Sequence, residues 1–167
     1  AFNNSGTFNR NGAAGGFALN GVNLTNNNAA SLTSITAGEL NLATTSYSQT
    51  AGTTTLNGGD LRADGTLLSG GVLKGINSVF GTPATTALLV SGTGRVQPGL
   101  STGALTVNGN ATVTYLQQAT GTLDIEIGGT TAGVSVDGYD RLVVSGTTGT
   151  VSLGGTLNVT LSGYTPV

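Results

Sequence analysis

The sequence predicts an all-β fold, a right-handed parallel β-helix (β-solenoid), and three observations lead to this prediction. A pattern of Gly, any residue, Leu, any residue and an aliphatic residue recurs at 38–42, 103–107, 121–125 and 155–159, with weaker copies at 59–63 and 71–75. The chain carries 29 glycines in 167 residues, roughly twice the usual share of about 7%. No window shows the apolar spacing of a helix. A turn-and-strand unit repeated in one chain is typical of a solenoid.

Short alternating or β-branched runs mark the individual strands. Asn-Gly, Gly-Gly, Ser-Gly and Asp-Gly pairs separate these runs and supply tight turns at low steric cost. The predicted strands are Phe17–Leu19, Leu32–Ile35, Glu39–Leu42, Ser46–Gln49, Thr53–Leu56, Asp60–Arg62, Val72–Lys74, Ala87–Val90, Ala104–Val107, Thr112–Leu116, Thr122–Ile127, Arg141–Val144, Thr150–Leu153 and Thr156–Leu161.

The uneven spacing of the pattern argues for coils of variable length. Its leucines lie 21 residues apart between Leu40 and Leu61 but 12 apart between Leu61 and Leu73. Coils of roughly 20 residues with about three strands each fit this spacing better than a strict hexapeptide helix, and they give about eight coils. The alternative is an antiparallel β-sandwich, because Asn108-Gly109 and Gly154-Gly155 resemble hairpin turns.

Alternation within the strands assigns their inward faces. A strand places every second side chain on the same side. The inward rows are therefore predicted to contain Leu123, Ile125 and Ile127 in one strand and Leu157, Val159 and Leu161 in another. Asn residues are expected to form amide ladders in the turns, because their side chains both donate and accept hydrogen bonds.

Composition narrows the class of function. Only 7% of residues are charged, the net charge is −2, and the five basic residues are scattered, which disfavours a nucleic-acid surface. No apolar run is long enough to span a membrane. The start of the sequence lacks the features of a signal peptide. We therefore expect residues 1–167 to form one continuous solenoid domain that is a segment of a longer secreted protein.

Any catalytic or metal-binding site would have to use carboxylates, because the chain has neither histidine nor cysteine. Asp124 and Glu126 point the same way on one predicted strand and could serve as an acid pair on a glycan. Asp137 and Asp140 lie nearby in a Gly-containing loop that could hold calcium, although a turn at Asp137-Gly138 with an Asp140–Arg141 ion pair explains the loop better. Thr-x-Thr pairs could bind ice, but their spacing is irregular. No catalytic, cofactor-binding or metal-binding residue is assigned.

Several segments resemble the passenger and repeat regions of bacterial autotransporter and filamentous-haemagglutinin-like surface proteins. They are the Asn-rich stretch 2–8, Val-Gln-Pro-Gly-Leu-Ser-Thr-Gly-Ala-Leu-Thr-Val at 96–107, Gly-Thr-Leu-Asp-Ile-Glu-Ile-Gly at 121–128, and the pair at 139–146 and 154–159. The resemblance covers most of the chain. It departs at 97–100, where the family's Ser and Asn are replaced.

This resemblance implies a non-enzymatic β-helix on the bacterial surface or in the extracellular matrix, serving as an adhesin stalk or a filament subunit. We expect it to act by presentation and by end-to-end association with a second copy or with further coils of the parent chain. Host or matrix glycans are possible partners; nucleic acid is not expected. The alternative is a β-helix that binds or cleaves carbohydrate through Asp124, Glu126, Asp137, Asp140 and Arg141.

Overall fold

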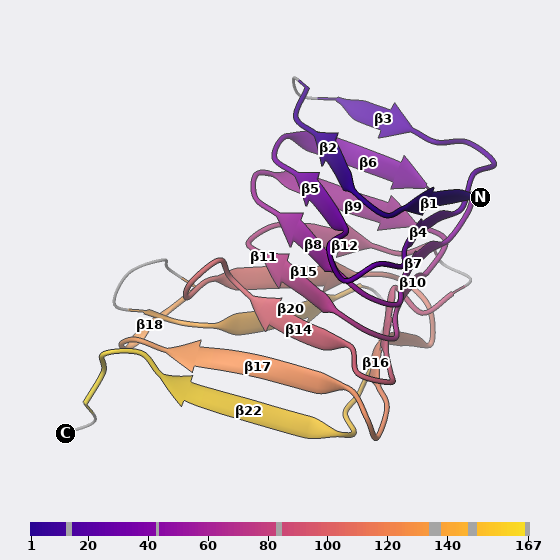
Figure 1. Ribbon diagram of the computed structural model, residues 1–167. Helices are drawn as coiled ribbons and strands as arrows, with labels where there is room; N and C mark the ends of the chain where they lie inside the picture. Colours follow the sequence, from indigo (N-terminus) through magenta and orange to yellow (C-terminus); the bar gives the residue numbers. More distant parts are fainter. Residues whose placement is uncertain (13–14, 43, 83–84, 134–137, 147–149, 166–167) are drawn as a thin grey trace.

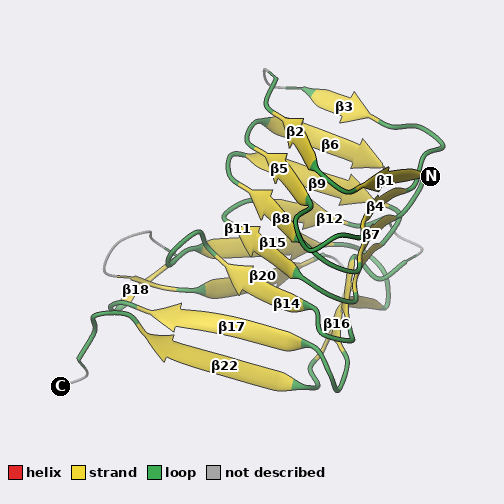
Figure 2. Ribbon diagram, in the orientation of Figure 1, coloured by secondary structure: helices red, strands yellow, loops and turns green. Residues whose placement is uncertain are grey.

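Three parallel sheets form the structure, and successive strands pass from one sheet to the next (Figure 1). The computed structural model describes residues 1–12, 15–42, 44–82, 85–133, 138–146 and 150–165. Strands and loops account for all of these residues (Figure 2). The described residues form no helix long and apolar enough to cross a lipid bilayer.

We call the sheets A, B and C, in the order in which the chain first enters them. Sheet A contains β1 (Phe2–Asn4), β4 (Leu24–Asn26), β7 (Tyr47–Gln49), β10 (Thr66–Leu68), β13 (Leu88–Val90), β16 (Val113–Gln117) and β21 (Thr150–Ser152). Sheet B contains β2 (Thr7–Arg10), β5 (Leu32–Ile35), β8 (Thr53–Leu56), β11 (Val72–Gly75), β14 (Arg95–Pro98), β17 (Thr122–Ile127) and β22 (Thr156–Leu161), with the short strands β18 (Thr131–Ala132) and β19 (Gly138–Tyr139) beside β17. Sheet C contains β3 (Gly16–Ala18), β6 (Gly38–Leu42), β9 (Gly59–Ala63), β12 (Ser78–Phe80), β15 (Ala104–Asn108) and β20 (Arg141–Ser145).

Parallel pairing between consecutive coils confirms the β-helix and rules out the antiparallel sandwich. In sheet C, for example, Leu40 is in register with Leu61, one coil later. The one antiparallel strand pair among the described strands joins β17 to β19 at Ile127 and Tyr139. Sheet A has one strand per coil and seven strands among the described residues, close to the expected number of about eight coils.

The Gly-x-Leu-x-aliphatic pattern falls on two sheets rather than one. The copies at 38–42, 59–63 and 103–107 lie on β6, β9 and β15 of sheet C, whereas those at 71–75, 121–125 and 155–159 lie on β11, β17 and β22 of sheet B. The spacing of 21 residues therefore measures a whole coil, and the spacing of 12 measures a step from sheet C to sheet B. This explains the unevenness seen in the sequence.

Two different constraints select glycine at the start of the pattern. Gly71 has a φ of 72°, and an added Cβ would lie 2.2 Å from the carbonyl oxygen of Gly52 in the preceding coil. Gly59 has no such φ, but its Cβ would lie 2.8 Å from the carbonyl oxygen of Gly38. Positive φ and close approach of neighbouring backbones both exclude a side chain.

An aliphatic core fills the space between the three sheets. Leu40, Leu61, Val79 and Val107 lie on consecutive strands of sheet C and are fully buried. Leu56, Leu73 and Val96 line sheet B from the inside in the same way. Burying one such side chain stabilises the fold by about 1.5–3 kcal/mol.

The prediction that Leu157, Val159 and Leu161 are buried is wrong. They are 63%, 50% and 55% exposed. Their strand, β22, pairs with β17 alone among the described strands. Leu123, Ile125 and Ile127 are also only half-buried, although their strand β17 has β14 on one side and β22 on the other. Stacking from one side is not enough to enclose an apolar row.

A polar network replaces the aliphatic core at the corner between sheets A and B in the first three coils. The Asn4 amide donates to Asn26 Oδ1 at 2.9 Å, and Thr33 Oγ1 donates to the same oxygen at 3.0 Å. Asn26 Nδ2 in turn donates to the Tyr47 hydroxyl at 2.9 Å, and Thr54 joins Tyr47 to Gln49. The predicted contact between asparagine amides is present for Asn4 and Asn26, but both lie at the ends of strands β1 and β4 and not in turns.

The predicted strands all coincide with observed ones to within one or two residues, but eight observed strands were missed. Most are three or four residues long, too short to show a period. In the Asn-rich stretch, β1 and β4 also bury Asn4 and Asn26 where the alternation rule looks for an aliphatic residue. The missed strands are β1, β2, β4, β10, β12, β14, β18 and β19.

Candidate functional site

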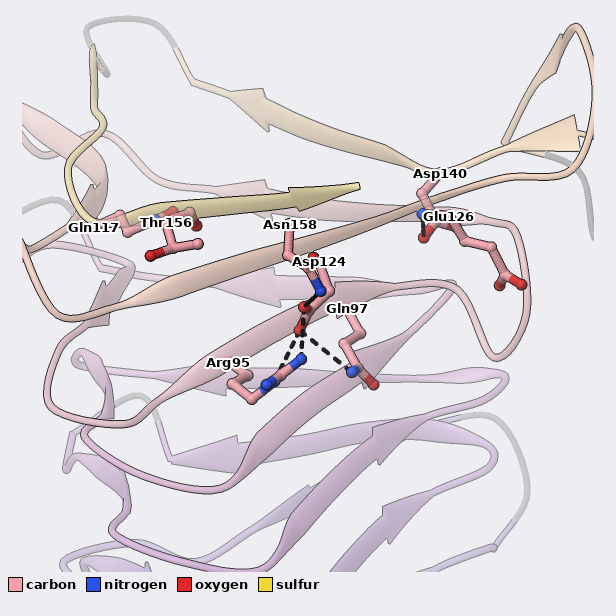
Figure 3. Close-up of polar contacts among 8 residues, drawn as sticks. All are labelled: Arg95, Gln97, Gln117, Asp124, Glu126, Asp140, Thr156 and Asn158. Carbon is pink, nitrogen blue, oxygen red and sulfur yellow. Dashed lines mark hydrogen bonds and ion pairs between the residues drawn. The ribbon is translucent and has the colours of Figure 1, made fainter. Parts of the chain in front are cut away.

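Two of the carboxylates that the sequence singled out, Asp124 and Glu126, lie on β17 of sheet B, beside β22 (Figure 3). There the outer face of β14, β17 and β22 forms a shallow pocket of about 240 Å³. Its lining consists of Arg95, Gln97, Asp124, Ile125, Glu126, Asn158 and Thr160.

Strand register brings these residues together from three coils. Side chains on alternate positions of a strand share a face. Thr122 is in register with Arg95, so Asp124, two residues on, reaches the level of Gln97. Asp124 is itself in register with Asn158 of β22. A row of polar side chains therefore runs across the strands at this end of the sheet.

The Asp124 carboxylate lies at the centre of the pocket, and three neighbouring side chains donate hydrogen bonds to it. Arg95 forms a bidentate ion pair with it, through Nη2 to Oδ1 at 2.6 Å and Nε to Oδ2 at 3.0 Å. Gln97 Nε2 donates to Oδ2 at 3.3 Å, and Asn158 Nδ2 donates to Oδ1 at 2.9 Å. In Figure 3 these three side chains converge on Asp124.

This geometry disfavours an acid pair formed by Asp124 and Glu126. Both side chains line the same pocket, as the alternation predicted. However, a carboxylate offers about four lone-pair sites, and Asp124 already accepts four hydrogen bonds. Asp124 is therefore poorly placed to exchange a proton with a substrate, and its contacts instead fasten β14, β17 and β22 together.

Asp140 has a different setting, behind the pocket and between strands. Its Oδ1 accepts the Gly103 N–H and its Oδ2 accepts the Glu126 N–H, both at 2.8 Å. Its own N–H donates to the Glu126 carbonyl at 2.8 Å. Burial raises the pKa of Asp140 to about 6, the neighbouring Glu126 charge adds to the rise, and the two backbone N–H groups oppose it. The carboxyl group thus joins β15, β17 and β20 where they meet.

The remaining predicted residues do not complete a site. Arg141 is exposed and forms no ion pair with Asp140, whose two carboxylate oxygens accept backbone N–H groups instead. Asp137 lies outside the described residues, so the predicted loop site cannot be placed. Within the described part of the chain, no three His, Cys, Asp or Glu side chains group together in a way that could hold a metal ion.

Sequence reasoning missed the partners of Asp124. Arg95, Gln97 and Asn158 lie 27–34 residues from it in the sequence. A signal was present: the segments Gly121-Thr122-Leu123-Asp124 and Gly155-Thr156-Leu157-Asn158 share a pattern and align in register. Aligning them would have placed Asp124 beside Asn158.

Comparisons with family models, curated proteins and solved structures gave no match to this chain. The assignment of the fold as a parallel β-helix therefore rests on how its strands pair.

Proposed function

We propose that this chain is a structural segment of an extracellular bacterial surface protein, acting as a stiff spacer in a stalk, adhesin or matrix. The observation that carries the proposal is the stack of parallel coils formed by the described strands, with a filled interior that extends from Leu24 to Tyr115. Each coil contacts chiefly its neighbours, so such a stack extends along one direction. The resemblance of 2–8, 96–107, 121–128, 139–146 and 154–159 to autotransporter and haemagglutinin-like repeats supports the same role.

The outer faces suit a spacer in an aqueous exterior. Sheet B carries small hydroxyl side chains on its outer face, such as the half-buried Ser34 and Thr55 at matching positions in adjacent coils. With only 7% of residues charged, these groups supply most of the surface polarity. A face of this kind stays hydrated without strong electrostatic attraction to particular partners.

A display experiment tests the spacer role. The chain is inserted between a membrane anchor and a fluorescent reporter on a bacterial surface, and the height of the reporter is measured. The control is a Gly/Ser linker of the same length, which behaves as a flexible coil with a broad distribution of heights. We expect a narrow distribution for the solenoid. A distribution as broad as that of the linker would refute the spacer role.

Glycan binding without cleavage is the second candidate, because the pocket on sheet B presents planar polar groups. Amide, guanidinium and carboxylate groups of this kind can orient a small polar ligand. A glycan array tests this, with Arg95→Ala and Asn158→Ala as pocket variants and Lys74→Ala as the control, since Lys74 lies in the same row outside the pocket. Binding lost only in the pocket variants would support it; no binding, or equal loss in Lys74→Ala, would refute it.

A further inference from the structure

The outer face of sheet A differs in chemistry from the outer faces of the other two sheets. Its outward row contains three leucines in register on consecutive strands, Leu67 of β10, Leu89 of β13 and Leu116 of β16. The outward rows of sheets B and C contain charged residues instead, such as Lys74 and Arg62. None of the seven described strands of sheet A contains a charged residue.

A hollow of about 290 Å³ lies beside this row, and we call it the sheet A hollow. Strands β7, β10 and β13 border it, and each of them pairs with a strand on both sides. The hollow therefore does not depend on what precedes β1 or follows β22. The lining side chains used below are Ser46, Ser48, Leu67, Thr85, Thr86 and Leu89.

Contacts between three consecutive coils build the wall of the hollow. The Thr85 hydroxyl donates to the carbonyl oxygen of Asp64, and the Thr82 hydroxyl donates to its carboxylate. The Asp64 N–H in turn donates to the carbonyl oxygen of Thr45 at 2.9 Å. The turns before β7, β10 and β13 are thus fastened to one another, so the hollow exists before any ligand enters it.

Hydroxyl groups on the lining are available to a ligand. Among the described residues, no side chain or backbone group forms a hydrogen bond with the hydroxyls of Ser46, Ser48 or Thr86. A hydroxyl can donate one hydrogen bond and accept others. A purely aliphatic occupant would remove these groups from water without giving them partners, which is unfavourable. The occupant should therefore carry hydrogen-bonding groups around an apolar centre.

The charge of the lining restricts the occupant further. No charged side chain lines the hollow, so an ionised ligand would lose hydration there without gaining a counter-charge. The negative charge of Asp64 stands behind Thr85, whose hydroxyl lies 3.4 Å from Asp64 Oδ1, and it would repel an anionic ligand. The volume is slightly below the range of about 300–1,000 Å³ that is usual for drug-sized ligands. A small, neutral ligand fits these limits.

We infer that the sheet A hollow binds one neutral sugar residue. A pyranose ring has apolar C–H faces, hydroxyls around its edge and no net charge, which matches the lining group by group. One C–H face would pack on Leu67 and Leu89, and ring hydroxyls would bond to Ser48 and Thr86. The inference rests neither on the spacer role nor on the pocket of sheet B, so each can fail alone.

Saturation-transfer difference NMR on the whole chain tests the inference. The probes are the neutral sugars glucose, galactose, mannose, fucose and N-acetylglucosamine, with glucuronic acid and N-acetylneuraminic acid as charged counterparts. Thr86→Val removes a hydroxyl at nearly constant volume, and Leu67→Ser makes the floor polar. The matched controls are Thr25→Val and Leu116→Ser, because both residues lie in the same outward row but outside the hollow. Circular dichroism checks that every variant is folded.

At least one neutral sugar should bind, and neither acidic sugar should. Thr86→Val and Leu67→Ser should each weaken binding roughly three- to tenfold, as expected for one lost contact, whereas the two controls should bind as the unmodified chain does. Binding of no neutral sugar, stronger binding of an acidic one, or equal loss in the controls would overturn the inference. So would binding that Arg95→Ala abolishes and the two hollow variants leave unchanged, since the sugar would then occupy the pocket of sheet B.

Discussion

Leu105 and Leu157 occupy the same place in the same sequence pattern, yet Leu105 is fully buried and Leu157 is 63% exposed. Both follow a Gly-x step and precede an aliphatic residue two positions on. Leu105 lies on β15, which has β12 on one side and β20 on the other. Leu157 lies on β22, which has β17 alone.

The difference shows what the pattern specifies and what it leaves open. Alternation determines which side chains share a face of the strand. Burial needs neighbours on both edges and an opposing sheet, and these come from other coils. In a solenoid, the stability of each coil therefore comes largely from its contacts with the coils on either side.

The largest effect on stability is expected from truncating Leu105, and the same truncation of Leu157 is the matched comparison. Leu105→Ala should lower the free energy of unfolding by about 2–5 kcal/mol, the cost of a cavity in a packed core. Leu157→Ala should change it by no more than about 0.5 kcal/mol, as is usual for surface substitutions. Urea denaturation at low protein concentration, where copies do not associate, measures both. Equal losses in the two variants would contradict the comparison.

A second comparison, between a polar and an aliphatic residue of the interior, concerns Asn26 and Leu68. Asn26 of β4 is two coils away from Leu68 of β10 in the same inward row, through Gln49. Asn26→Leu should nevertheless destabilise the fold by about 1–3 kcal/mol, because it leaves the buried amide of Asn4 and the hydroxyl of Thr33 without their shared acceptor. Thermal unfolding followed by circular dichroism measures it. A neutral effect would mean that the network can rearrange.

Asp140 links the buried coils to β17 and should make stability depend on pH. The pKa of Asp140 is about 6 in the folded chain and 3.8 as its ordinary value. Between these values the folded state binds more protons than the unfolded state, so the Asp140 contribution to stability is present in full below about pH 4 and is lost as pH rises through 6.

Urea midpoints measured from pH 4 to pH 7 test this effect. Subtracting the profile of Asp140→Asn, which does not titrate, isolates the contribution of Asp140. The difference should fall with rising pH and level off above about 7. A difference that rises over this range would show that the two backbone N–H groups outweigh burial.

A small effect is expected at the surface pair of Arg95 and Asp124. The Arg95 side chain is 45% exposed, and exposed ion pairs contribute about 0–1 kcal/mol. Arg95→Gln should therefore lower stability by less than 1 kcal/mol, and added salt should reduce the difference. Urea denaturation at low and high salt measures both. A larger loss would mean that this pair, rather than the aliphatic core, fastens β17 to β14.

The sequence was enough to predict the strands that carry aliphatic residues and the parallel coils, but the two inward rows assigned from it, on β17 and β22, are half-buried and exposed. It was not enough to show which sheet each copy of the pattern joins, since a coil can gain or lose residues in its turns without changing its strands. Arg95 and Asn158 could not be assigned to Asp124 for that reason. The exposure of Leu157 was not predictable either, because it depends on which strands lie beyond β22.

Distances between spin labels test the stacking of parallel coils most directly. The chain has no cysteine, so labels can be attached at chosen sites. Asn9, Ser34, Thr55, Lys74 and Gln97 are aligned on consecutive strands of sheet B, and Asn158 lies two strands further on.

Double electron–electron resonance on Asn9→Cys/Gln97→Cys and Asn9→Cys/Asn158→Cys gives the two distances. At about 4.8 Å per strand, the coil stack predicts backbone separations of about 19 Å for four steps and about 29 Å for six. A second distance no longer than the first would contradict the stack.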